Sequence, residues 1–158
     1  MADEIEEAPA ILARQAIELA QPLGQLRSRL QRLEPSVVVT CARGSSAHAA
    51  TFGKHLIERY LRLPVAEAAP SISSIYRRGL NLRNQVLLAI SQSGCSDDLI
   101  AFAIDARGSG ALTVAITNAP ASPLANACEY VLPLAAGYEH SIAATKTFMM
   151  RCVRLDRN

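Results

Sequence analysis

The chain has 158 residues, half of them hydrophobic, and carries a formal net charge of +2. This length is typical of one domain, and the apolar content is sufficient for one core. The small net charge and the scattered arginines argue against nucleic acid or a membrane surface as a partner. No apolar run reaches the length of a membrane span.

The cysteines and the first residues indicate the cellular compartment. The four cysteines form no CxxC pair, so we expect no metal site, and no organic cofactor is expected either. Residues 1–7 are acidic and lack the apolar segment of a signal peptide. Free thiols without such a signal favour the reducing cytoplasm.

The first 34 residues are predicted to form an N-terminal helical segment. Apolar residues recur at roughly helical spacing from Ile5 to Leu33, and a break is expected near Pro22 and Gly24. After this segment the pattern changes to short apolar runs without alternation, which are typical of parallel strands covered on both faces. The three strong runs span residues 37–39, 86–90 and 112–116.

Two weaker strands and several helices complete the pattern. The weaker strands are expected at residues 65–67 and 130–134, and Pro133 should put the second of them at a sheet edge. The helices are expected at residues 47–61, 97–107 and 122–128, and from about Ser141 onward. This alternation predicts an α/β fold, a three-layer α-β-α sandwich around a five-stranded parallel sheet.

Two hydroxyl-rich loops follow strong strands directly and open helices. They span residues 41–46 and 91–96, and each contains one glycine. Glycine lets a backbone approach a ligand closely, and the N–H groups at a helix start attract anions. In a flavodoxin-like strand order, which the sequence does not fix, the two loops would face one crevice. The alternative is that their serines only cap helices.

A third segment, residues 136–146, follows the last strand. Its acid–base candidates are Glu139, His140 and Lys146. Each also has an ordinary structural interpretation. Glu139 can be an acid in the first turn of a helix, His140 a solvated side chain, and Lys146 a surface or ion-pairing residue.

An ordered set of motifs resembles the sugar isomerase (SIS) domain family. The motifs are residues 91–94 (SQSG) with Ser96, residues 116–118 (ITN) with residues 122–124 (SPL), and residues 143–148 (AATKTF). The similarity runs from about Ser36 to Phe148. It is strongest to the first SIS domain in the isomerase half of glucosamine-6-phosphate synthase, and it extends to related amino-sugar-phosphate deaminases and isomerases.

The resemblance implies a flavodoxin-like SIS fold and a set of ligand contacts. The implied phosphate contacts are Ser91, Gln92, Ser93 and Ser96. The implied sugar contacts are Ser45, Ser46, Ile142 and Ala144. Two departures stand out, because the family often has an acidic residue where this chain has Cys95, and the synthase has serine at the position of Ala144.

The domain assignment follows from the same resemblance. Residues 35–150 are assigned to the SIS domain and residues 151–158 to a polar C-terminal tail. The family's second SIS domain is missing from this sequence, so we expect the chain to associate with a second copy as a homodimer.

Two functions from different classes remain open. In the first, the chain is an aldose–ketose isomerase or a glucosamine-6-phosphate deaminase of amino-sugar metabolism, acting on a ligand such as fructose 6-phosphate or glucosamine 6-phosphate. In the second, it is a non-catalytic sugar-phosphate sensor or binding module. The absence of the second half, where much of the family's proton-transfer machinery lies, supports the second function, but the enzyme is the preferred interpretation.

Overall fold

The computed structural model describes the backbone of residues 8–136 and the side chains of residues 15–136. Five helices and five strands lie within this range. They are α2 (Ala8–Leu33), β1 (Val38–Ala42), α3 (Ser45–Leu61), β2 (Val65–Glu67), α4 (Ser71–Ser74), β3 (Val86–Ile90), α5 (Asp97–Gly108), β4 (Leu112–Thr117), α6 (Pro123–Ala127) and β5 (Tyr130–Pro133).

The strands form one sheet in the order β2-β1-β3-β4-β5, and every neighbouring pair is parallel. This is the flavodoxin-like order, so the predicted α/β fold with a five-stranded parallel sheet is confirmed. β5 lies at an edge and includes Pro133, as the missing N–H of that residue requires.

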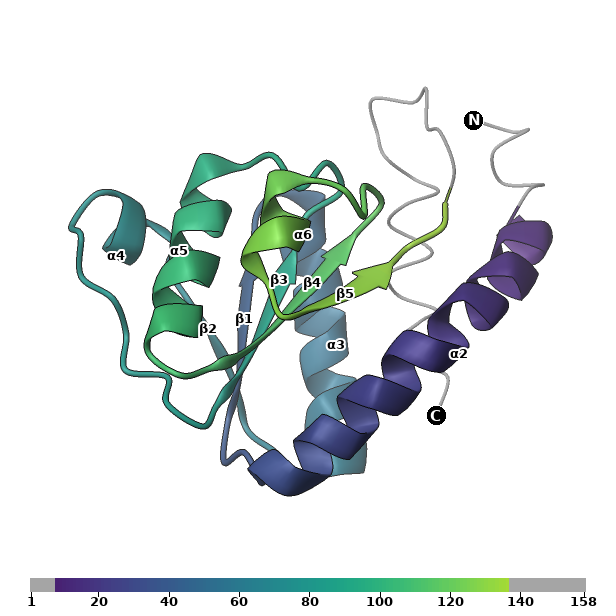
Figure 1. Cartoon of the computed structure of the whole chain (residues 1–158), viewed down its shortest axis with the longest axis horizontal. Helices are drawn as coiled ribbons and strands as arrows, with labels where there is room; N and C mark the ends of the chain where they lie inside the picture. The colour runs from purple at the N-terminus through teal and green to yellow at the C-terminus, as the bar shows by residue number, and fades with distance from the viewer. Residues whose placement is uncertain (1–7, 137–158) are drawn as a thin grey trace.

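Helices cover both faces of the sheet, which gives the three predicted layers. Figure 1 shows α3 behind the sheet and α5 and α6 in front of it, with α2 running beneath β5. Successive strand residues alternate between two apolar clusters, because side chains along a strand point to opposite faces. In β1, for example, Val38 joins the cluster shared with α2 and α3, whereas Val39 joins the cluster shared with α5 and α6.

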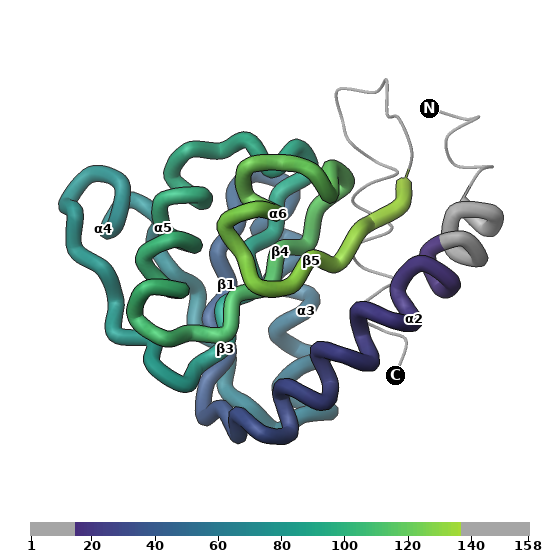
Figure 2. Tube along the Cα trace, viewed as in Figure 1, coloured from purple at the N-terminus to yellow at the C-terminus, as the bar shows by residue number. Residues whose placement is uncertain are grey.

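Helix α2 is continuous, so the predicted break near Pro22 and Gly24 is wrong. Proline inside a helix removes one N–H and one hydrogen bond, but packing of the residues on either side of it can keep the helix continuous. Leu19 and Leu26 are both buried in the same cluster, one on each side of Pro22. Gln15 adds a tether, because its Nε2 donates to the Leu134 carbonyl oxygen over 2.9 Å. Figure 2 follows this helix as one unbroken coil along the side of the molecule.

Smaller differences concern the ends of elements and one missed helix. Helix α3 begins at Ser45, two residues earlier than predicted, so Ser45 and Ser46 belong to its first turn. The short, hydroxyl-rich helix α4 was not predicted. Among the described residues, none of the helices has an apolar stretch long enough to cross a membrane.

Candidate functional site

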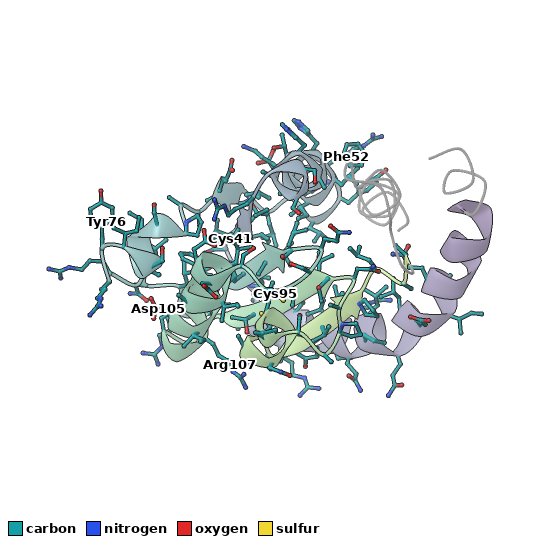
Figure 3. The ribbon with its side chains drawn as sticks, turned by 90° about the horizontal axis from the view of Figure 1, so that it is seen from above. Cys41, Phe52, Tyr76, Cys95, Asp105 and Arg107 are labelled. Atoms are coloured by element: carbon teal, nitrogen blue, oxygen red, sulfur yellow. The ribbon has the colours of Figure 1, made fainter. Side chains whose placement is uncertain are left out.

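The two loops predicted from the sequence begin side by side at the carboxyl edge of the sheet. β1 and β3 are neighbours, and their last paired residues are Ala42 and Ile90. The chain leaves β1 toward α3 on one face and leaves β3 toward α5 on the other. This is the topological switch point at which open α/β sheets bind ligands. In Figure 3, Cys41 near the end of β1 and Cys95 in the loop after β3 lie between the helix carrying Phe52 and the helix carrying Asp105 and Arg107.

The loop from Ser91 to Ser96 is folded back on itself by its own hydroxyl groups. The Gly94 N–H donates to the buried Ser91 Oγ over 3.1 Å, and the Cys95 N–H donates to Ser93 Oγ over 3.3 Å. Each hydroxyl accepts one bond here and keeps its own O–H available as a donor. Ser91 is therefore partly structural, whereas Ser93 is exposed at the rim.

Gly94 fixes the shape of this loop through its conformation and its close packing. Its φ is +65°, in the region where residues with a Cβ are strained. A Cβ at this position would overlap Ser122 and crowd Thr117. The Gly94 carbonyl oxygen also accepts a bond of 3.0 Å from Leu124 N–H at the start of α6. The glycine therefore presses the loop onto the segment between β4 and α6.

Residues at and just after the end of β4 hold the candidate phosphate loop, and their supporting role was not predicted. Thr117 Oγ1 and the Asn118 N–H both donate to the Gln92 carbonyl oxygen over 3.1 Å. Asn118 Oδ1 accepts a bond of 2.9 Å from the Ala136 N–H, where the chain leaves β5. Thr117, Asn118 and Ser122 belong to motifs seen in the sequence, but only the folded chain reveals their contact with the SQSG loop.

The start of α5 is not capped by the side chain of its N-cap residue. Ser96 is its N-cap residue, yet in the described part of the chain its side chain makes no capping bond to the helix. Of the N–H groups in this first turn, that of Leu99 donates to Asp98 Oδ1 over 3.0 Å. The N–H groups of Asp97 and Asp98 precede it, and the helix dipole favours an anion there. The alternative that Ser96 only caps the helix is thus not supported by its geometry, and the side chain can contact a ligand.

The neighbouring start of α3 is built in a similar way. Gly44 precedes this helix with a φ of +54°, which glycine adopts readily. Ser45 is exposed and Ser46 is buried in the first helical turn. Both serines therefore lie at the start of α3, next to the same switch point, and their contact with a sugar stays a prediction.

An ion pair joins the two loops. Arg43 Nη1 lies 3.0 Å from Asp98 Oδ2, so the loop after β1 is linked to the first turn of α5. The first turn of α5 carries two carboxylates, Asp97 and Asp98. Asp97 is exposed, but Asp98 turns toward the neighbouring loop and is largely covered there.

The buried thiol of Cys41 lies near the carboxylate of Asp98, which affects its pKa. Burial, together with the smaller effect of the nearby carboxylates of Asp98 and Glu67, raises its pKa to about 12. Cys41 thus stays protonated at neutral pH and supplies no nucleophile. Cys95 is exposed, and its Sγ donates to the Ser93 carbonyl oxygen over 3.3 Å. Within residues 15–136, no group of three or more His, Cys, Asp or Glu side chains is arranged to hold a metal.

Several predicted site residues lie outside the described part of the chain. They are Glu139, His140, Ile142, Ala144 and Lys146. The described site therefore consists of the two loops, the starts of α3 and α5, and the supporting segment after β4.

Comparison with known proteins gives the family context. The profile of the SIS domain matches residues 34–156. A glutamine–fructose-6-phosphate aminotransferase (isomerizing) from Clostridium acetobutylicum is 30% identical over 145 residues, 92% of this chain and 23% of the relative. The same enzyme from Symbiobacterium thermophilum is 34% identical over 84% of this chain and 21% of its own length. The chain thus spans less than a quarter of these curated relatives.

Solved structures agree with the fold. The crystal structure of a candidate phosphosugar isomerase from Silicibacter pomeroyi DSS-3 superimposes with a TM-score of 0.93 at 42% identity, over 97% of this chain and 47% of that one. The C-terminal domain of glucosamine-fructose-6-phosphate aminotransferase from Francisella tularensis gives a TM-score of 0.82 over 98% of this chain and 44% of that one. Its identity is 24%, so this second likeness concerns the fold alone.

Proposed function

This chain belongs to the SIS domain family, and we propose that it binds a phosphorylated sugar at the switch point between β1 and β3. The observation that carries the proposal is the start of α5, which the Ser96 side chain does not cap, directly behind the hydroxyl-rich Ser91–Ser96 loop. Backbone N–H groups, hydroxyls and a helix dipole then converge on one spot, which suits a phosphate group.

The proposed phosphate contacts are Ser91, Gln92, Ser93 and Ser96. Ser91 and Ser93 already accept backbone bonds within the loop, so each offers its O–H to the anion. Ser45 and Ser46 are proposed to contact the sugar from the start of α3. Ile142 and Ala144, from the segment beyond the described residues, complete the proposed sugar contacts.

The proposed reaction is aldose–ketose isomerisation or deamination of an amino-sugar phosphate. Opening of the sugar ring is followed by proton transfer between C1 and C2, with Glu139, His140 and Lys146 as the acid–base candidates. The phosphate loop positions the reacting carbons by binding a group that does not itself react. The names of the relatives, which include fructose 6-phosphate and phosphosugar, support this substrate class.

Calorimetry tests the binding function. We expect wild type to bind glucosamine 6-phosphate or fructose 6-phosphate and to bind the unphosphorylated sugars far more weakly. A hydrogen bond to a charged group contributes about 1.5–3 kcal/mol, so Ser93→Ala and Ser96→Ala should each weaken binding by about tenfold or more. Ser28→Ala is the control, because Ser28 only back-bonds to Gly24 on α2.

Equal affinity of all four proteins, or equal affinity for phosphorylated and unphosphorylated sugar, would contradict the assignment. A separate assay of ammonia release from glucosamine 6-phosphate distinguishes a deaminase from a sensor that only binds. The expected homodimer and the cytoplasmic location remain predictions.

A further inference from the structure

We propose that Arg43 is a further phosphate-binding residue of this site, held in position by Asp98. The inference rests on the proposed function and adds a cation from the loop after β1 to the loop after β3. No motif quoted for the family resemblance includes Arg43, and its place in the fold is what points to it.

The strand register brings Arg43 beside the phosphate loop. Arg43 directly follows Ala42, and Ala42 pairs with Ile90, which directly precedes Ser91. Neighbouring strands lie about 4.8 Å apart, so Arg43 and Ser91 leave the sheet next to each other. A guanidinium on a three-carbon stem easily spans the loop from this position.

Asp98 then fixes the direction in which the guanidinium lies. The ion pair of 3.0 Å ties Arg43 Nη1 to the first turn of α5, two residues after Ser96. A guanidinium has five N–H donors in a rigid fork, and within the described residues this pair engages only Nη1. The Arg43 side chain is 67% exposed, so its remaining donors are open to a ligand at the start of α5.

The charge balance of the site requires such a cation. Asp97 and Asp98 occupy the first turn of α5, and Glu67 lies near the end of β1. A phosphate dianion placed among these carboxylates would be repelled. Arg43 is the single basic residue in residues 41–47 and 91–98. It offsets Asp98 and supplies the charge-assisted bonds that arginine forms with phosphate.

The ion pair is partly covered, since the Arg43 side chain is 67% exposed and that of Asp98 is 20% exposed. Loss of Arg43 is therefore expected to lower the folding stability somewhat, and the melting temperature of each variant is measured beside its affinity.

The experiment compares Arg43→Gln with Lys54→Gln. Lys54 forms an exposed ion pair of 3.8 Å with Glu58 farther along α3, so both variants lose one charge and one surface ion pair. Affinity for glucosamine 6-phosphate is measured by calorimetry in low and moderate salt, with melting temperature as the check on folding. We expect Arg43→Gln to weaken binding by about tenfold to a hundredfold and to reduce its salt dependence. Lys54→Gln should change affinity by less than about twofold.

Two more variants separate phosphate binding from a purely structural ion pair. Arg43→Lys keeps the charge but loses the fork, so its affinity should fall between wild type and Arg43→Gln. Asp98→Asn removes a carboxylate near the dianion, so it should cost much less affinity than Arg43→Gln.

The outcomes are distinct. If wild type binds but Arg43→Gln matches Lys54→Gln, the inference is wrong while the proposed function stands. If wild type binds no sugar phosphate, the proposed function fails first.

Discussion

Gly94 is the residue on which the shape of the phosphate loop depends most directly. Substitution by alanine would place a Cβ against Ser122 in a conformation with a positive φ. The left-handed backbone costs about 1–2 kcal/mol, and the overlap costs about 1–3 kcal/mol more. We expect Gly94→Ala to lower the free energy of unfolding by about 2–5 kcal/mol in urea titrations and to abolish measurable sugar-phosphate binding.

Gly108→Ala is the matched control for this change. Gly108 ends α5, has no positive φ, and has no atom within 4 Å of the position that a Cβ would occupy. Its stability should therefore change by less than about 1 kcal/mol. A Gly94→Ala protein as stable as Gly108→Ala would show that the loop can relax away from Ser122.

Residue-level reasoning from the sequence found the loop but not its supports. Ser91, Ser93 and Ser96 stand out because they follow an apolar strand and precede a helix within six residues. The contacts of Gly94 with Ser122, and of Arg43 with Asp98, join residues that are 28 and 55 positions apart. Such contacts depend on the order of the strands, which local patterns do not determine.

At the scale of elements, continuous apolar runs were the reliable signal. Residues 86–90 and 112–116 have few polar positions because both faces of their strands are covered, and they appear as β3 and as most of β4. The prediction of a break in α2 was wrong because local sequence signals were outweighed by tertiary packing. Proline and glycine weaken an isolated helix, but the burial of Leu19 and Leu26 on the sheet outweighs this local cost.

Pro22 is therefore expected to be a local defect in a helix that tertiary packing maintains. Pro22→Ala restores an N–H donor to the carbonyl oxygen of Glu18 and should raise the free energy of unfolding by about 1–3 kcal/mol. Gly24→Ala at a neighbouring open position should add less, about 0.5–1 kcal/mol. Thermal unfolding of both variants tests this order. A lower melting temperature for Pro22→Ala would mean that the proline has a favourable role in α2.

At the scale of the whole molecule, the sheet is shared by two apolar clusters, and this predicts a single unfolding transition. Each inner strand contributes alternate residues to both clusters. Loss of packing in one cluster would therefore disturb the strands on which the other cluster depends. The segment most able to separate is α2, which precedes β1 and covers only one face. Its buried Leu26 and the buried Leu99 of α5 report on the two sides of the sheet.

Leu26→Ala and Leu99→Ala make the same chemical change in the two clusters. Each should lower the free energy of unfolding by about 2–5 kcal/mol, because methyl groups leave the core and a cavity remains. If the domain unfolds as one unit, both variants keep one transition, and circular dichroism and tyrosine fluorescence give the same midpoint. If α2 separates on its own, Leu26→Ala alone will show an early loss of helical signal while Leu99→Ala remains two-state. We expect the first result, because Gln15 joins α2 to the carbonyl oxygen of Leu134 just after β5, and Leu19 and Leu26 share their cluster with residues from all five strands.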